Sequence, residues 1–406
     1  MLARADLERL SEGQVVEPVE LSLAEATALA TTNLVTVQPG VGGWRVTAAH
    51  AVGAVRCGNL RVRVQPKVGT VQVLRLLARA HGIRGLRIDE SLIEVHTDPE
   101  LTVVLAALFA EEAATAMAAG PLRGYRTEDQ TANVLRGRLR MREQELRRFG
   151  LPLPLEVTID DWTADTTENR RIRAATRRLL NLPYLPAGVR ARLLRTDRVL
   201  ADVWAAPRGA VLPSWTSTRL NVRMHRLLLL SDLVLDQATV EHRIGDIEVH
   251  GFALSMSWLF ERLVTQLLTE NRGRLSLHAQ RTFPLDTFGR LTIRPDLIFA
   301  DRERVVAVAD TKYKLMDDNG NIPNPDVYQL VTYCTRLGLA AGHLIYATDQ
   351  PHRESFEIIG TGVQLGVHAV DLGRSVGEIE ERVRQTLELI LATQLPDSGH
   401  RPLSGG

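Results

Sequence analysis

The sequence has very little cysteine: only Cys57 and Cys334 occur in 406 residues. Two cysteines so far apart form neither the disulfide framework of a small secreted domain nor a cysteine-rich zinc site. The first residues also lack the apolar core of a secretory signal. We therefore expect a reducing, cytoplasmic setting for this chain.

Long apolar runs are missing as well. The longest such stretch, residues 101–110, runs directly into Glu111 and Glu112. A membrane-spanning helix needs roughly 20 apolar residues, so we expect no membrane segment. With 45% hydrophobic and 24% charged residues, the composition is that of a globular protein, and the length suggests two or three domains.

Lysine is rare: Lys67, Lys312 and Lys314 are the only three among 49 basic residues. None of them lies in the Gly-Lys-Ser/Thr context of a Walker A loop, so any nucleotide hydrolysis must come from a partner. Because arginine supplies the general positive charge, a retained lysine indicates a place where a compact ammonium is needed. Two of the three lysines fall within residues 310–314.

Positive charge is concentrated in one part of the chain. The net charge of the whole chain is only +1, which by itself does not indicate a nucleic-acid partner. Residues 121–225, however, contain 20 Arg and no Lys against 11 Asp and Glu, an excess of nine positive charges. This stretch is suited to face a phosphate backbone. Solvated helix faces and contact with a protein partner are the alternatives that the sequence leaves open.

The alternation of polar and apolar residues predicts a mixed α/β protein, α+β overall, with three domains. Residues 1–120 are expected to form a β-rich N-terminal domain, with strands at 34–37, 44–46 and 60–64 and helices at 71–80 and 99–119. Residues 121–215 are expected to form an Arg-rich helical region that closes with a linker-like segment, 207–217. Residues 216–406 are expected to form a domain with a mixed sheet.

The C-terminal domain carries the clearest pattern of helices and strands. A helix is predicted over 254–268, with Glu261 beside its apolar stripe. Asn324, Pro325 and Asp326 mark the start of a second helix, which carries Gln329 and Tyr333. Strands are predicted at 275–281, 291–299, 304–312, 343–347, 355–360 and 363–370, and a closing helix at 376–393. The continuous apolar run 305–309 is typical of a central strand that is buried on both faces.

Acidic residues and a lysine fall on two consecutive predicted strands. Asp296 lies within the strand 291–299, and Asp310 and Lys312 lie at the end of the next strand. Since residues two apart in a strand point to one face, Asp310 and Lys312 should project together, and Asp296 reaches them if the strands are neighbours. Carboxylate oxygens suit Mg²⁺, which would polarise a scissile phosphate. The alternative is a surface salt bridge among these residues that also includes Lys314.

Three more side-chain roles follow from this placement. We expect Lys312 to orient or deprotonate an attacking water, or to balance charge in the transition state. Glu261 would complete the metal shell of Asp296 and Asp310, and Gln329 would position the water or a phosphate. The alternatives are a solvated helix residue for Glu261 and ordinary packing for Gln329.

Several motifs, taken in order, resemble the PD-(D/E)XK nuclease superfamily and, within it, the McrC family. The similarity covers most of the chain. Residues 64–69 resemble the family's Pro-Lys-Val-Gly turn, and residues 165–170 its Glu-Asn-Arg helix start. Residues 256–261, 294–296, 310–314 and 326–330 with Tyr333 resemble the helices and the two catalytic strands of the nuclease core.

The resemblance implies a function and a set of partners. It implies the nuclease subunit of a restriction system that acts on modified cytosine and cuts double-stranded DNA with Mg²⁺. The implied partner is an AAA+ GTPase ring of the McrB kind, which binds the GTP and is stimulated by the N-terminal part of this chain, and a second copy of the chain is implied for cutting. A stand-alone repair or recombination nuclease, and a non-catalytic activator or assembly factor of an AAA+ motor, remain alternatives.

Overall fold

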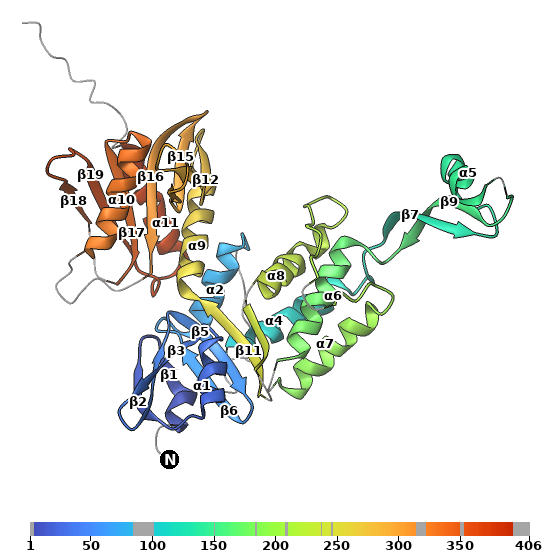
Figure 1. Cartoon of the computed structure of the whole chain (residues 1–406), viewed down its shortest axis with the longest axis horizontal. Helices are drawn as coiled ribbons and strands as arrows, with labels where there is room; N and C mark the ends of the chain where they lie inside the picture. Colours follow the sequence, from blue (N-terminus) through green and yellow to red (C-terminus); the bar gives the residue numbers. More distant parts are fainter. Residues whose placement is uncertain are drawn as a thin grey trace, which may run out of the picture. The chain divides into compact units, whose positions relative to one another are not determined.

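Figure 1 shows the computed structural model of the chain, which describes residues 4–83, 101–149, 151–182, 185–207, 210–236, 238–244, 247–313, 322–349 and 353–392. The chain forms two compact units: unit 1 is Met1–Ile88, Val240–Val249 and Ala253–Gly406, and unit 2 is Asp89–Thr239 and His250–Phe252. Helices and several sheets are mixed, so the predicted α/β class is confirmed. The two units group the residues differently from the three predicted ranges 1–120, 121–215 and 216–406, which stay a prediction.

The N-terminal part of unit 1 is rich in strands, and its predicted strands at 34–37, 44–46 and 60–64 are present. A three-stranded sheet has the order β2-β4-β3, and a five-stranded sheet has the order β1-β6-β5-β11-β10. The side chains of Leu60, Val62 and Val64 in β6 alternate into a buried apolar core, as the sequence pattern indicated. The elements are η1 (Ala5–Arg9), β1 (Leu10–Ser11), β2 (Val15–Val19), α1 (Leu23–Ala30), β3 (Val35–Gly40), β4 (Gly43–Ala48), β5 (Ala51–Cys57), β6 (Leu60–Gln65), α2 (Thr70–Ala80), β10 (Ala238–Ile244) and β11 (Ile247–Ser255).

The C-terminal part of unit 1 is built on a six-stranded mixed sheet with the order β12-β15-β16-β17-β19-β18. The inner strands β16, β17 and β19 are parallel, and the remaining pairs are antiparallel. Helix α10 packs Leu330 and Tyr333 against Val308 and Leu344 in one buried cluster. The elements are α9 (Met256–Asn271), β12 (Ser276–Ala279), β13 (Phe283–Pro284), β14 (Thr292–Ile293), β15 (Leu297–Asp301), β16 (Arg304–Lys312), α10 (Asn324–Leu337), β17 (Ala341–Ala347), β18 (Arg353–Glu357), β19 (Gln364–Val370) and α11 (Val376–Ala392).

One strand of this sheet differs from its prediction. The sequence indicated a single strand over 291–299, whereas the structure has β14 and then β15, which begins at Leu297. Pro295 has no N–H to donate to a ladder and disfavours continuation of a central strand. Asp296 therefore lies in the turn directly before β15 and not within a strand.

Unit 2 is not only helical, which corrects the prediction for its Arg-rich part. Strands β7 and β9 pair antiparallel along their full length, from Gly124 with Thr163 to Ala132 with Leu155, and β8 lies on the other side of β9. The signal was an alternation of apolar and polar residues over 155–159, which the neighbouring prolines and arginines obscured. The elements are α4 (Leu101–Ala116), β7 (Gly124–Ala132), β8 (Arg138–Leu139), α5 (Met141–Arg148), β9 (Leu155–Thr163), α6 (Thr167–Leu180), α7 (Ala187–Val199), η2 (Val222–Met224) and α8 (His225–Asp236).

The segment predicted as a linker, 207–217, belongs to unit 2 and is attached to its helices where it is described. The indole N–H of Trp215 donates to Asp232 of α8 at 2.7 Å, and Arg171 of α6 donates to the carbonyl of Pro213 at 3.0 Å. Within the described part of the chain, no helix is both long and apolar enough to cross a membrane.

Candidate active site

The end of strand β16 has a sheet neighbour on one side only. Its pairing with β15 stops at Ala309, which lies opposite Leu297, while its pairing with β17 continues to Lys312, which lies opposite Tyr346. The strand is buried along 307–310 because its apolar run is covered on both faces. Asp310 and Lys312 thus extend beyond the last β15 pair, which leaves room for other groups beside them.

Asp310 and Lys312 form an ion pair, as expected for residues two apart on one strand face. The Nζ atom of Lys312 lies 2.5 Å from Oδ2 of Asp310, whose residue is only 2% exposed. Burial, together with the negative charge of Asp296, raises the pKa of Asp310 to about 6. Burial alone would lower the pKa of Lys312, but the adjacent Asp310 carboxylate outweighs it and raises that pKa. Both groups are therefore charged at neutral pH.

Asp296 reaches the same place from the turn before β15. Its Oδ2 atom accepts hydrogen bonds from the backbone N–H of Thr311 at 2.9 Å and from the Thr311 hydroxyl at 2.8 Å. Its carboxylate thus lies on the side of β16 that β15 has left. The structure brings together Asp296, Asp310 and Lys312, although Asp296 arrives by a turn and not by a strand.

Glu261 projects from α9 toward these two carboxylates. Burial raises the pKa of Glu261, and the negative charges of Asp296 and Asp310 raise it further. Its Oε1 atom accepts a hydrogen bond from the side-chain amide of Gln280 at 2.5 Å, and Arg294 donates to the other end of that amide at 2.5 Å. Glu261 is therefore half-buried and bonded, which differs from a freely solvated helix residue.

Gln329 contacts the predicted catalytic lysine directly. Its amide oxygen accepts a hydrogen bond from Nζ of Lys312 at 2.8 Å, and its amide nitrogen donates to the hydroxyl of Tyr333 at 2.6 Å. Gln329 and Tyr333 lie four residues apart on α10, so both face β16. In the structure Gln329 holds Lys312, and its role toward a water or a phosphate stays a prediction.

Some neighbours of the site were not found in the sequence. Asp326 is buried, accepts a hydrogen bond from the Tyr346 hydroxyl at 2.7 Å, and has an oxygen 3.9 Å from Nζ of Lys312. In the sequence it indicated only a helix start, and its position across from β16 depends on the packing of α10. Gln280 and Thr311 carried no pattern of their own. Lys314, included in the alternative salt bridge, lies outside the described residues.

The carboxylates at this site suit a hard cation that needs few protein ligands, such as Mg²⁺. Within the described ranges, no group of three or more His, Cys, Asp or Glu side chains has the spacing to hold a metal ion. Mg²⁺ is commonly held by one or two carboxylates, with waters and substrate phosphates completing its shell. Asp296 and Asp310 are such a pair, and their crowding, seen in the raised pKa of Asp310, favours a cation between them. These residues fit Mg²⁺, and Glu261 as a third ligand stays a prediction.

The Arg-rich stretch forms many ion pairs within unit 2. Asp165 pairs with Arg170 at 2.6 Å, and also with Arg126 at 2.5 Å. Asp197 of α7 pairs with Arg173 of α6 at 3.2 Å. These arginines stabilise unit 2 through ion pairs with its own acidic residues. Others in the stretch are exposed, including three that lie on or beside β8 and α5, namely Arg136, Arg138 and Arg142.

Comparisons with known proteins agree with the resemblance in the motifs. The family described as McrBC 5-methylcytosine restriction system component matches residues 46–347. No curated protein matches the chain. A solved structure described as a refined half-complex from the tetradecameric assembly of Thermococcus gammatolerans McrB AAA+ hexamers with bound McrC contains a chain of similar fold, with a TM-score of 0.57 and 18% identity. The alignment covers 94% of this chain and 99% of that chain.

A second structure is described as the cryo-EM structure of the Thermococcus gammatolerans McrBC complex. Its TM-score is 0.43 at 21% identity, over 66% of this chain and 88% of that chain. This value is too low to add to the fold assignment. The family match, by contrast, spans well over half of the sequence. The family predicted from the motifs is confirmed, and the chain belongs to the McrBC family of 5-methylcytosine restriction system components.

Proposed function

We propose that the chain is the Mg²⁺-dependent endonuclease subunit of a McrBC-type restriction system and cuts modified double-stranded DNA. The observation that carries the proposal is the meeting of Asp296, Asp310 and Lys312 at the end of β16, where the strand has lost its β15 neighbour. Family membership supports the restriction context. The resemblance of residues 295–296 and 310–312 to the PD-(D/E)XK motif supports phosphodiester hydrolysis.

The side chains divide the work of hydrolysis. Asp296 and Asp310 would hold Mg²⁺, with Glu261 beside them. When bound, Mg²⁺ would supply Lewis-acid polarisation of the scissile phosphate. The turn and the two bonds from Thr311 keep Asp296 in place, so the pair of carboxylates is arranged before DNA arrives.

Lys312 would balance the negative charge that grows on the phosphate. The adjacent Asp310 carboxylate raises the pKa of Lys312, so this side chain is an ammonium at neutral pH and a poor proton acceptor. Gln329 accepts one of its N–H bonds and thereby orients the ammonium along the face of α10. Among the three roles predicted for Lys312, charge balance in the transition state is the one that this environment supports best.

GTP hydrolysis is assigned to a partner. The chain has no Walker A sequence. The matched Thermococcus gammatolerans structure is described as McrB AAA+ hexamers with bound McrC, which supports an AAA+ ring as the partner of this chain. We assign ring contact and stimulation of GTP hydrolysis to the N-terminal part of the chain, and we propose that a second copy of the chain takes part in cutting both DNA strands.

The test is a cleavage assay with the full chain, its McrB-like partner, GTP and MgCl₂ on DNA with or without 5-methylcytosine. The wild type should cut only the modified DNA, and only when partner, GTP and Mg²⁺ are all present. Asp310→Asn should lower the cleavage rate about 100-fold or more, because it removes one of the two carboxylates proposed to hold Mg²⁺ beside the scissile phosphate. Asp301→Asn, at the exposed end of β15, is the matched control and should cut at the wild-type rate.

Two other results would replace this proposal. Efficient cutting of unmodified DNA by the chain alone would indicate a stand-alone nuclease. Undiminished cutting by the complex that contains Asp310→Asn would indicate that the chain only activates or assembles the motor. Partner GTP hydrolysis, measured in the same samples, should be unaffected by Asp310→Asn if the catalytic and activating roles are separate.

A further inference from the structure

The last residues of β16 depend on side-chain contacts for their position. Beyond Ala309 the strand keeps its ladder with β17 but has no β15 neighbour. A strand end with one neighbour moves more easily than a strand paired on both sides. Two side-chain contacts also hold this end of the chain: Asp296 accepts a hydrogen bond from Thr311, and Glu12 accepts one from Tyr313, the residue after Lys312.

Glu12 belongs to the N-terminal part of unit 1, about 300 residues away in sequence. Its Oε2 atom accepts a hydrogen bond from the Tyr313 hydroxyl at 2.7 Å, and its Oε1 atom accepts from the backbone N–H of Lys67 at 3.1 Å. The ring of His50 lies edge-on to Tyr313, with centroids 5.8 Å apart. Glu12 and His50 of the N-terminal part thus contact the Tyr313 side chain, and the backbone of Lys67 holds the Glu12 carboxylate.

Burial of the Glu12 carboxylate is energetically unfavourable unless other contacts offset its loss of hydration. It is only 4% exposed, and in the described part of the chain no cationic side chain forms an ion pair with it. A buried carboxylate that has only neutral donors loses much of its hydration, whereas an apolar residue at this place would avoid that loss. Its presence is explained if a strong, directional hydrogen bond to Tyr313 is required.

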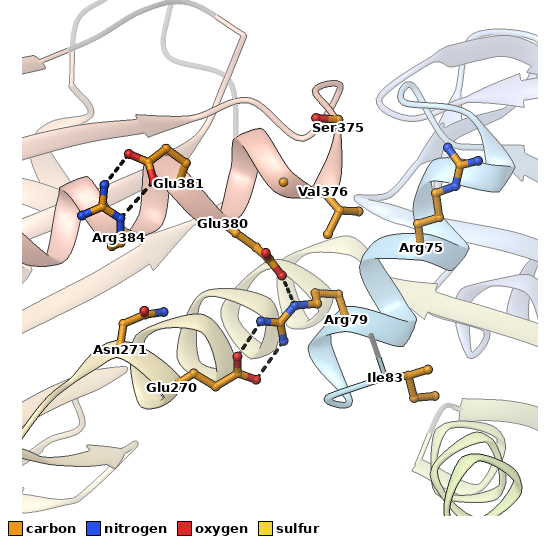
Figure 2. Close-up of a pocket in the computed structure, with 11 residues that line it drawn as sticks. Arg75, Arg79, Ile83, Glu270, Asn271, Ser375, Val376, Glu380, Glu381 and Arg384 are labelled. Atoms are coloured by element: carbon orange, nitrogen blue, oxygen red, sulfur yellow. Dashed lines mark hydrogen bonds and ion pairs between the residues drawn. The ribbon is translucent and has the colours of Figure 1, made fainter. Parts of the chain in front are cut away.

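Two further sets of contacts attach the N-terminal helix α2 to the C-terminal part of unit 1. The side-chain amide of Gln72 donates to the carbonyls of Leu372 at 2.9 Å and Arg374 at 2.6 Å, directly after β19. Figure 2 shows the buried guanidinium of Arg79 between Glu270 of α9 and Glu380 of α11, with bonds to Glu270 of 2.9 and 2.6 Å. These contacts attach the N-terminal part of unit 1 to the C-terminal part independently of the Glu12–Tyr313 bond.

We propose that Glu12 and Tyr313 are positioning residues for phosphodiester hydrolysis. Their hydrogen bond fixes the end of β16, and this keeps the Lys312 ammonium between Asp310 and Gln329. The inference rests on the proposed nuclease function and extends it, because it makes the N-terminal part of unit 1 a component of the nuclease as well as a contact for the partner.

The test compares variants of the full chain in the cleavage assay with partner, GTP and MgCl₂. Tyr313→Phe removes one hydroxyl and should lower kcat about 10-fold, with KM for DNA within about twofold of wild type. The matched control is Tyr328→Phe on α10, where the side chain is 66% exposed, and it should leave kcat unchanged.

Glu12 variants test the partner of that hydroxyl. Glu12→Ala should lower kcat to the same extent as Tyr313→Phe. Glu12→Gln should restore most of the rate, because its amide oxygen can accept from the Lys67 N–H while its amide N–H donates to the Tyr313 hydroxyl oxygen, which keeps a bond to Tyr313. The double variant Glu12→Ala/Tyr313→Phe should be no slower than the slower single variant, since both changes remove one bond. Additive losses in the double variant, or no recovery in Glu12→Gln, would overturn the proposal.

Amide hydrogen exchange gives a readout that does not need cleavage. Tyr313→Phe should speed exchange in residues 310–313 and leave residues 297–301 of β15 unchanged. If wild-type complex does not cut DNA, the nuclease function fails while the exchange result still tests the anchoring. A lower melting temperature with wild-type kcat and wild-type exchange at 310–313 would show that the contact serves general stability only, and would overturn the positioning role.

Discussion

The contacts of Lys312 explain why this position has a lysine although lysine is rare in the chain. The ammonium of Lys312 lies 2.5 Å from Asp310 and 2.8 Å from the amide oxygen of Gln329. A guanidinium is planar, longer and able to bind a carboxylate with two bonds, so it would draw Asp310 away from a metal. The proposed role of residue 312 therefore requires a lysine, in a chain whose other basic residues are almost all arginine.

We expect Lys312→Arg to lower the cleavage rate of the complex about 100-fold while the melting temperature changes little. Lys67→Arg is the matched control, because the Lys67 side chain is exposed and only its backbone N–H binds Glu12. Cleavage rates of both variants under saturating DNA would check this. A Lys312→Arg enzyme as fast as Lys67→Arg would contradict the need for an ammonium.

His343 makes a residue-scale prediction about pH and stability. It is 1% exposed, and its Nδ1 atom lies 3.2 Å from Nε2 of His368. Burial, with His368 nearby, lowers the pKa of His343 to about 3. The unfolded chain takes up a proton near pH 6.5 while the folded chain does not, so the free energy of unfolding falls as pH drops below about 6.5, by up to about 1.4 kcal/mol per pH unit.

Urea denaturation at pH 7, 6 and 5 would measure this effect. His343→Gln should show a smaller loss of stability between pH 6.5 and 5 than the wild type, because its side chain takes up no proton in the unfolded chain. His278→Gln, at an exposed position on β12, is the matched control and should keep the wild-type slope. Equal slopes for His343→Gln and His278→Gln would contradict the assignment.

At the scale of elements, the sequence predicts the bounds of a strand best where the strand is a continuous run of buried apolar residues. The bounds of β16 follow from the run 305–309, and the start of α10 follows from Asn324, Pro325 and Asp326. The period of two then places Asp310 and Lys312 on one face. The arrival of Asp296 by a turn, and the contacts of Gln280 and Asp326, depend on tertiary packing that no local pattern contains.

The three-stranded sheet β7-β9-β8 in unit 2 gives an element-scale prediction. Gly137 has φ of +77°, and a Cβ atom at this position would overlap the carbonyl oxygen of Thr158 in β9. Gly137→Ala should therefore destabilise the chain by about 1–3 kcal/mol, since both backbone strain and a clash are introduced. Chemical denaturation followed by circular dichroism would measure the change.

Gly188 in α7 serves as the control for that substitution. It has no positive φ, and no atom lies within 4 Å of a Cβ built on it. Gly188→Ala should leave stability unchanged or raise it by up to about 1 kcal/mol, because alanine favours a helix over glycine. A Gly137→Ala chain as stable as Gly188→Ala would mean that the backbone of Gly137 does not approach β9 in this way.

At the scale of the whole molecule, the sequence order hides how the chain is assembled. Met1–Ile88 at one end of the sequence and Ala253–Gly406 at the other belong to unit 1, while Asp89–Thr239 between them belongs to unit 2. The Glu12–Tyr313 bond joins positions 301 residues apart, and composition shifts along the chain do not reveal such a pairing. The residue pattern and the family resemblance predicted that Asp296, Asp310 and Lys312 meet, but not the contact between Glu12 and Tyr313.

The Arg-rich stretch carries the prediction that involves the whole complex. Most arginines of α6 form ion pairs with acidic residues of unit 2. The exposed Arg136, Arg138 and Arg142 are therefore better candidates for contact with DNA or a protein partner. We expect the triple change of these three to Glu to weaken DNA binding by the assembled complex. The slope of log affinity against log salt should become shallower by about one for each lost phosphate contact.

The matched triple change to Lys keeps the charge and should retain both affinity and salt slope. Neither triple variant should alter the Mg²⁺ concentration at half-maximal cleavage, because the proposed metal site lies in unit 1. If the Glu variant binds its partner less tightly while the salt slope for DNA is unchanged, the stretch contacts the partner, since only phosphate contacts release counterions from DNA. Wild-type affinity for both DNA and partner would show that these arginines are a solvated surface of unit 2.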